Sequence, residues 1–243
     1  MAESACFEFA VISDHYFPWV EAMGHSPYAW SVLGAVAHAT SQIELMSYVT
    51  CPIKRYHPAV VAQKAATVGL LFDGRFTLGL GAGENLNEHI TGGGWPPVNV
   101  RHQMLSEAVD IIRLLWAGDY VNFDGHHFKV DSAKLWDLPD QPLKLGIAAS
   151  GQQSSQLAGQ KADCLIAVDP SPGIVTAFDA AGGTGKPRVG QATSELRPRP
   201  GHCNQAGIGA VRMVRRRMEG QFRAAEYGSV RGRLPVRAAG RHR

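Results

Sequence analysis

The chain has 243 residues, of which 45% are hydrophobic and 19% are charged. This composition is ordinary for a globular protein, and the length suits one α/β barrel or two smaller domains. No stretch approaches the roughly 18 continuous apolar residues of a membrane span, and the N-terminus lacks the basic and apolar regions of a signal peptide. We therefore expect a cytoplasmic protein with no membrane partner.

The cysteine spacing excludes two kinds of site. The four cysteines, at positions 6, 51, 164 and 203, lie far apart and form no Cys-x-x-Cys pair. Neither a zinc site nor a redox dithiol is indicated, so we expect reduced thiols.

Charge is distributed unevenly along the chain. Residues 1–191 hold 12 Lys or Arg and 18 Asp or Glu, whereas residues 192–243 hold 12 Arg and 3 Glu. This imbalance divides the chain into an acidic domain, 1–191, and a basic tail, 192–243. The tail is rich in Arg, Gly and Ala, and we expect it to be disordered. Only residues 211–222 have a helical pattern there.

Strands and helices alternate through the first domain. Short apolar runs rich in aliphatic and aromatic residues predict strands at 7–12, 43–50, 76–80, 145–148, 164–168 and, less distinctly, 186–191. Longer amphipathic segments predict helices at 28–40, 58–72, 104–116 and 154–160. A hairpin with its turn at Asp124-Gly125 is expected within 118–136. The alternation predicts a parallel sheet flanked by helices, either a closed barrel or an open doubly wound sheet.

Asp14 and His15 directly follow the first predicted strand. In parallel α/β folds such positions lie at the C-terminal end of the sheet, where active sites are found. A histidine beside an aspartate can transfer protons near neutral pH. The alternative is a capping aspartate and a structural histidine. Trp19, in the same loop, could form one wall of a flat ligand site or simply pack the loop.

A glycine-rich stretch, GLGAGENLNE at 79–88, follows the third predicted strand. Glycines permit close approach of a ligand to the backbone, and Glu84, Asn87 and Glu88 supply polar groups at the same edge. The third glycine of a dinucleotide fingerprint would fall at Glu84, so that motif is absent. A glycine turn with a capping asparagine is the alternative interpretation.

Two further features have more than one interpretation. The segment 148–152 joins a strand to a helix, so Ser150 and Gly151 could bind a phosphate or form a plain capped turn. His126 and His127 lack a third ligand at a telling spacing, so we predict a surface hairpin and no metal site.

The basic tail has no nucleic-acid-binding motif, and we do not expect nucleic acid as a partner.

Together these stretches resemble the luciferase-like monooxygenase superfamily, and in particular its branch that uses the deazaflavin coenzyme F420, which includes F420-dependent glucose-6-phosphate dehydrogenases. The motifs that carry the resemblance are SDHYFPW (13–19), TCP (50–52), RYHP (55–58), DGR (73–75), GAGENLNE (81–88), WP (95–96), Arg101 and KLWDLP (134–139). The resemblance covers about residues 4–191, and several motifs in the right order are more specific than any one of them.

The resemblance implies a TIM-like (β/α)₈ barrel that binds F420 at the C-terminal ends of its strands. It implies catalytic roles for His15 as acid/base, Trp19 beside the reacting centre and Glu84 as a proton-handling group. The coenzyme-binding residues that it implies are Asp14, Tyr48, Val49, Cys51, Ala82, Gly83, Glu84, Asn87, Ser150 and Gly151. Tyr48–Val49 matches the place where the family has a non-proline cis peptide. The implied chemistry is hydride transfer between F420 and a small organic substrate, and the family implies a homodimer. FMN with monooxygenase chemistry is the alternative.

The chain departs from the family pattern in three places. A lysine of the sugar-phosphate dehydrogenases is replaced by Asp169-Pro-Ser-Pro172, so we do not expect glucose 6-phosphate as substrate. The chain begins before the family's second strand, without its first, and the resemblance stops at Gln191. Arg, Gly, Ala and Pro fill 29 of the last 52 positions, as in a GC-rich gene read out of frame. We therefore expect a barrel incomplete at both ends, and an inactive truncated product is the further alternative.

Overall fold

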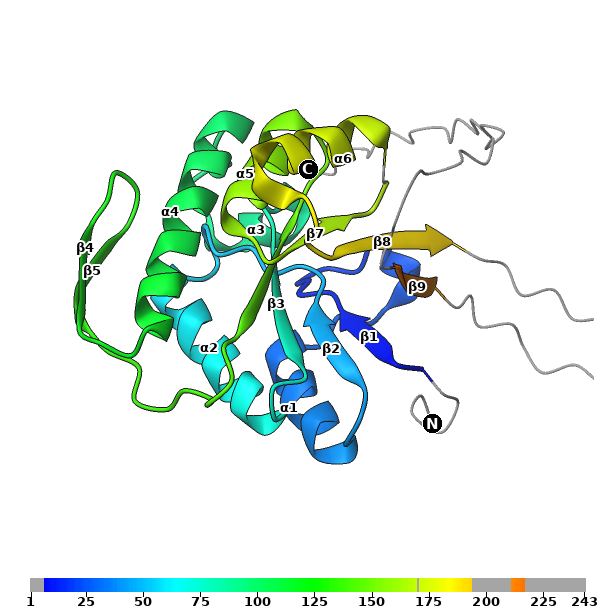
Figure 1. Cartoon of the computed structure of the whole chain (residues 1–243), viewed down its shortest axis with the longest axis horizontal. Coiled ribbons are helices and arrows are strands. Elements are labelled where there is room, and N and C mark those ends of the chain that lie inside the picture. Colours follow the sequence, from blue (N-terminus) through cyan, green and yellow to red (C-terminus); the bar gives the residue numbers. More distant parts are fainter. Residues whose placement is uncertain (1–6, 170, 194–210, 217–243) are drawn as a thin grey trace, which may run out of the picture.

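In the computed structural model, which describes residues 7–169, 171–193 and 211–216, seven strands form one curled sheet (Figure 1). Its order is β1-β2-β3-β6-β7-β8-β9. The first six strands are parallel, and β9 is antiparallel to β8. Their bounds are β1 Phe9–Ile12, β2 Glu44–Ser47, β3 Phe76–Leu80, β6 Lys144–Ala148, β7 Cys164–Ala167, β8 Arg188–Thr193 and β9 Val211–Arg216.

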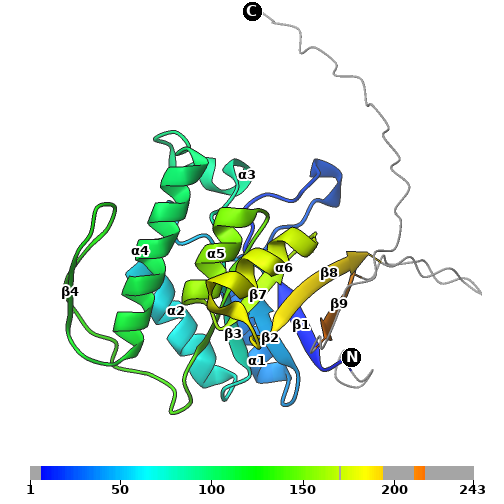
Figure 2. The same cartoon turned by 45° about the horizontal axis from the view of Figure 1, so that its top comes forward.

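Helices cover the outer side of this sheet (Figures 1 and 2). They are α1 Ala29–Ala39, α2 Pro58–Leu71, α3 Asn85–Glu88, α4 Val98–Trp116, α5 Gln152–Lys161 and α6 Pro172–Phe178, with short turns at Glu21–Met23, His89–Thr91 and Asp179–Gly183. Pro58 begins α2 at a position where its missing N–H costs nothing. The long helix α4 buries an apolar stripe that includes Leu105 and Ile112.

The two faces of the sheet bury different side chains. Leu45, Leu78 and Leu165 pack outward in the large cluster shared with the helices. Met46 and Ile166 alternate with them along the same strands and belong to a second, inner cluster. A sheet with helices on one face and its own side chains filling the other is the arrangement of a barrel wall, and it excludes the doubly wound alternative.

The curling brings the two edges of the sheet towards each other. β9 comes close to β1 (Figures 1 and 2). The pairing of β1 with β2 runs from Phe9 opposite Glu44 to Ile12 opposite Ser47, so both strands end at the same level. The loops that follow them therefore emerge side by side.

The predicted strands and helices of the first domain are confirmed, with boundaries shifted by a few residues. α3 and α6 were not expected from the pattern. The helix expected from the pattern at 211–222 is wrong for Val211–Arg216, which form a strand. Pairing with β8 overrides a weak local preference for helix there. Residues 194–210 and 217–243, to which most of the predicted disordered tail belongs, lie outside the described residues.

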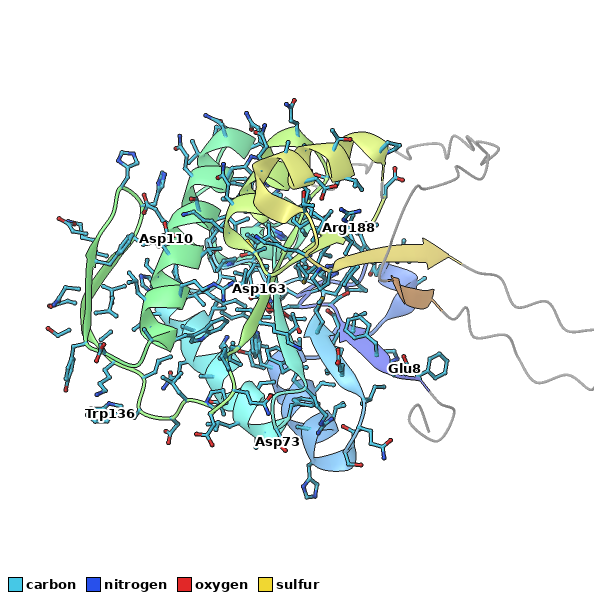
Figure 3. The ribbon with its side chains drawn as sticks, in the orientation of Figure 1. Glu8, Asp73, Asp110, Trp136, Asp163 and Arg188 are labelled. Atoms are coloured by element: carbon cyan, nitrogen blue, oxygen red, sulfur yellow. The ribbon has the colours of Figure 1, made fainter. Side chains whose placement is uncertain are left out.

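The predicted hairpin is also confirmed, as β4 Val121–Asp124 and β5 Lys129–Ala133. It stands beside α4, and Trp136, shortly after β5, lies at the end of the hairpin opposite its turn (Figure 3). Glu107 of α4 holds the turn by accepting backbone hydrogen bonds from His126, His127 and Phe128 at 2.9–3.2 Å. Within the described part of the chain no helix is long and apolar enough to cross a membrane, and no cluster of three metal-ligating side chains occurs.

Two glycines give a matched test of the packing. A Cβ on Gly79 of β3 would collide with the backbone carbonyl of Ser47 and stand 2.9 Å from Ile166, whereas one on Gly34 of α1 would meet nothing within 4 Å. We expect Gly79→Ala to lower the free energy of unfolding by about 1–3 kcal/mol. Gly34→Ala should raise it by about 0.5–1 kcal/mol, because alanine favours a helix interior. Urea denaturation measures both, and equal effects would contradict the described approach of β2 and β3.

Candidate active site

The candidate residues gather at one end of the sheet. Four consecutive strands end there, and their loops supply Asp14 and His15 after β1, Tyr48 and Val49 after β2, Ala82, Gly83 and Glu84 after β3, and Ser150 and Gly151 after β6. We call this end, with the loops that follow β1, β2, β3, β6 and β7, the mouth. The carboxyl ends of these parallel strands meet at one edge, which brings the predicted site residues to the same end of the sheet; their roles stay predictions.

Asp14 is a buried hub of hydrogen bonds. Its Oδ2 accepts from Trp30 Nε1 at 3.0 Å and from Thr50 Oγ1 at 2.9 Å. Its Oδ1 accepts from Tyr56 OH at 3.3 Å and from Arg55 Nη2 at 3.2 Å. The carboxylate oxygens thus have four protein donors, so this side chain anchors the loop that carries His15.

Arg55 connects Asp14 with α3. Its Nη2 also donates to the Asp14 carbonyl at 2.6 Å, and its Nε donates to Glu88 Oε1 at 3.3 Å. The Arg55 backbone N–H donates to Glu88 Oε2 at 3.0 Å. Burial is the largest single influence and lowers the pKa of the Arg55 guanidinium, but Asp14, Tyr56 and Glu88 together outweigh it, so the pKa is raised. Burial also raises the pKa of Glu88, and the hydrogen bonds from Arg55 oppose that rise.

His15 is half-buried beside this network. Its ring meets the Trp19 ring edge-on, with centroids 5.0 Å apart, and the Trp19 side chain remains 59% exposed. Burial lowers the pKa of His15 below its usual 6.5, Arg55 lowers it further, and Glu84 and Asp14 oppose the decrease. This lowering favours the neutral imidazole, the form that accepts a proton.

The short helix α3 holds the same loop from the other side. Asn87, which is buried, accepts at Oδ1 from the backbone N–H groups of Tyr16 at 2.9 Å and Phe17 at 3.2 Å. The sequence reasoning assigned Asn87 to the coenzyme, and here its oxygen orders the loop after His15. Glu84 is the exposed N-cap residue of α3, and its side chain makes no capping bond.

The Tyr48–Val49 peptide bond is cis, as the resemblance implied. Tyr48 lies in the inner cluster, and among the described residues its hydroxyl has no hydrogen-bond partner. Burial raises the pKa of this phenol to about 12. A Cβ on Gly81 would stand 2.6 Å from Val49, so glycine is what lets the two loops approach.

The remaining predicted positions line the same loops. Cys51 is buried, and its Sγ occupies the space where a Cβ on Gly83 would stand. The carbonyls of Ala82 and Gly83 each accept from Arg101 Nη1 at 3.0 Å, so these positions are held by the protein. Their part in coenzyme binding stays a prediction.

At the start of α5, the N–H groups of Ser150 and Gly151 both donate to Ser154 Oγ at 3.2 Å. The capped turn that was one interpretation of this segment is therefore present. Any anion at this point would have to use the next N–H groups of the helix or displace the serine hydroxyl.

The network around Asp14 contains residues that sequence reasoning did not single out, namely Trp30, Thr50, Arg55 and Tyr56. A signal existed for three of them, since Thr50 and the Arg55-Tyr56 pair stand in motifs that carry the resemblance. Nothing in the local pattern indicated Trp30, which reaches Asp14 from α1.

Residues 1–178 match the luciferase-like monooxygenase family. The chain belongs to that family. A curated relative, the F420-dependent hydroxymycolic acid dehydrogenase of Mycobacterium tuberculosis, is 46% identical over 166 residues, which are 68% of this chain and 46% of the relative. An F420-dependent glucose-6-phosphate dehydrogenase of Beutenbergia cavernae is 43% identical over 68% of this chain and 49% of its own length. The chain thus spans about half the length of the curated relatives it matches.

Solved structures show the same fold. An F420-dependent secondary alcohol dehydrogenase in complex with an F420-acetone adduct superimposes with a TM-score of 0.71 and 36% identity, covering 74% of this chain and 56% of that one. The coenzyme F420 dependent tetrahydromethanopterin reductase from Methanopyrus kandleri, at 24% identity and a TM-score of 0.62, covers the same shares and supports the fold alone. The predicted (β/α)₈ fold class of the luciferase-like type is confirmed.

The Asn87 contacts give a test with an isosteric control. Asn87→Ala removes the acceptor of the Tyr16 and Phe17 amides, so these amides should exchange roughly tenfold faster with solvent, as expected for a lost hydrogen bond. Asn87→Asp retains an acceptor oxygen and should leave their exchange slow. Amide hydrogen exchange by NMR distinguishes the variants, and equally fast exchange in both would contradict the ordering role.

Proposed function

We propose that this chain is an F420-dependent oxidoreductase that transfers a hydride between the coenzyme and an alcohol or ketone. The observation that supports it best is the position of His15 between two held neighbours, Asp14, which Arg55 contacts, and Tyr16, whose amide donates to Asn87. The same mouth carries Glu84 and the cis peptide. The relatives named above as F420-dependent dehydrogenases support the same function.

The residues present fit the coenzyme. The buried Tyr48 hydroxyl lacks a partner among the described residues, and a ligand with a polar edge can satisfy it. Tyr48, Val49 and the backbone at Gly81–Gly83 would hold the ring, while Ser150 and Gly151 would lie on the phosphate side. Bound F420 supplies two-electron hydride chemistry.

The chain's own residues supply the proton transfer. In alcohol oxidation the carbinol hydrogen would pass as hydride to the bound coenzyme, and a ring nitrogen of His15 would accept the hydroxyl proton, so that a ketone and an imidazolium result. The reverse direction returns that proton to the carbonyl oxygen. Trp19 packs against one side of His15. Glu84 has the largest of the influences that raise the pKa of His15, and its negative charge stabilises the imidazolium.

Charges at the mouth favour a neutral substrate. In the described loops of the mouth, the cationic side chains are Lys54 and Arg55, and Arg101 of α4 reaches the same loops. Lys54 and Arg101 donate to backbone carbonyls, and Arg55 donates to Asp14 and Glu88. Glu84 and Asp169 are exposed there. The carboxylates of Asp14, Glu84, Glu88 and Asp169 leave the described mouth without an excess of positive charge to attract a sugar phosphate, so we propose a neutral secondary alcohol or ketone.

Exposed apolar side chains extend this argument. Tyr16, Trp19 and Val20 follow β1, and Val168 follows β7, each more than half exposed. An apolar edge beside the reacting centre favours a substrate with a hydrocarbon arm. The relatives' names, hydroxymycolic acid dehydrogenase and secondary alcohol dehydrogenase, agree with this class. A cytoplasmic location and a homodimer are also parts of the proposal. The buried Cys51, which forms no disulfide in the described part of the chain, supports the first, and the family resemblance supports the second.

Coenzyme binding is the direct test. Oxidised F420, followed by its fluorescence, should bind the purified chain at least about tenfold more tightly than FMN. His15→Gln should bind F420 with nearly unchanged affinity but lose about 10²–10⁴ in turnover, because only the proton acceptor is removed. Preferential FMN binding would favour monooxygenase chemistry. Binding of neither coenzyme would favour the inactive alternative.

The substrate class is tested separately with F420-loaded protein. We expect reduction of F420 by 2-propanol and, at lower concentration, by 2-octanol, and none by glucose 6-phosphate. Absorbance at the oxidised deazaflavin band measures each rate. Turnover of glucose 6-phosphate in preference to the alcohols would contradict the argument from the charges at the mouth.

A further inference from the structure

Arg55 is the buried cation of the mouth, and no role in the reaction has been assigned to it above. It lies between β2 and α2, in a turn that precedes Pro58. The side chains of Arg55, Asp14 and Glu88 are 7%, 1% and 1% exposed. One guanidinium therefore joins carboxylates from two other elements, the loop after β1 and the helix α3.

Arg55 contacts a backbone carbonyl group as well as two carboxylates. Nη2 reaches the carbonyl of Asp14 at 2.6 Å, which is the peptide group directly before His15. Nε and the Arg55 main-chain N–H are both directed at Glu88. The planar fork of arginine makes these contacts in fixed directions, which the single ammonium of lysine does not reproduce.

α3 carries the second half of the arrangement. Glu88 accepts hydrogen bonds from Arg55, and the adjacent Asn87 accepts those of the Tyr16 and Phe17 amides. Glu84, at the start of the same helix, is the charged group with the largest effect on the pKa of His15. His15 thus lies between two anchored points of one loop, and both anchors lead to α3.

We propose that Arg55 is a positioning residue: it locks the Asp14–His15 backbone against α3, so that His15 and Glu84 face a common reacting centre. The reference to a reacting centre rests on the proposed function, whereas the positioning itself concerns the protein alone.

The positive charge of Arg55 also affects the pKa of His15. The groups acting on His15 are Glu84, Arg55 and Asp14, besides burial. Removing the positive charge of Arg55 takes away an influence that lowers the pKa of His15 and leaves Asp14 to raise it. The pKa of His15 should therefore rise in Arg55→Gln and stay low in Arg55→Lys, which keeps a cation.

Arg55 could instead stabilise the fold without any effect on His15, since removal of one partner of a buried ion pair is commonly destabilising. The matched control is Arg113→Gln. Arg113 pairs with Asp163 at 2.8 Å on the surface, with its side chain 35% exposed, far along the chain from the loops of the mouth. It changes the same charge at a salt bridge that does not contact His15.

The experiment is an NMR titration of the histidine ring protons of the full chain without coenzyme, with His15→Gln assigning the His15 resonance. In the parent, the Trp19 ring 5.0 Å away should displace that resonance. We expect Arg55→Lys to lose the displacement while the His15 pKa stays low, and Arg55→Gln to lose the displacement and raise the pKa. Arg113→Gln should change neither. Addition of F420 should show about tenfold weaker binding to either Arg55 variant than to the control.

An unchanged His15 resonance and pKa in folded Arg55→Gln would overturn the proposal. If Arg55→Gln does not fold, the ring-current displacement in Arg55→Lys decides: its retention overturns the proposal and its loss supports it. Failure of the parent chain to bind F420 would overturn the proposed function but leave the histidine titration as a valid test of positioning.

Discussion

The arrangement of the mouth depends on one buried cation between two buried carboxylates. Arg55 joins Asp14 to Glu88 with side chains almost removed from solvent. Breaking such a contact leaves an uncompensated buried charge, which typically costs about 3–5 kcal/mol. These contacts therefore resist displacement, and through the Asp14 carbonyl they hold the loop in which His15 stands.

The sheet makes this network possible. Parallel strands of matched register end at one level, so the loops after β1, β2 and β3 meet although up to about seventy residues separate them in the chain, as with the hydrogen bond from Tyr16 to Asn87. Inward-facing glycines keep the loops close, because a Cβ at Gly81 would press on Val49. The long helices contribute mainly to the outer core, but Trp30 of α1 reaches Asp14, and Asn87 and Glu88 of the short helix α3 hold the loops of the mouth.

The sequence predicted the alternation of strands and helices well, because each element has the apolar spacing that its own geometry requires. The residues of the mouth followed from ordered motifs rather than from spacing, since a lone Asp14-His15 pair has a common structural explanation. Local patterns could not reveal that the oxygen of Asn87 serves the Tyr16 and Phe17 amides, because that contact depends on tertiary packing. Val211–Arg216 was misjudged for the same reason: pairing with β8 decides its conformation.

We propose that a preformed mouth, ordered by Arg55, receives F420 beside His15. The most direct measurement is a crystal structure of the chain grown with saturating oxidised F420. The account predicts the deazaflavin ring against the Tyr48–Val49 peptide and next to His15, with the Asp14–Arg55–Glu88 contacts as they are without coenzyme. A ring bound elsewhere, or an Arg55 that leaves Asp14 when the coenzyme binds, would contradict it.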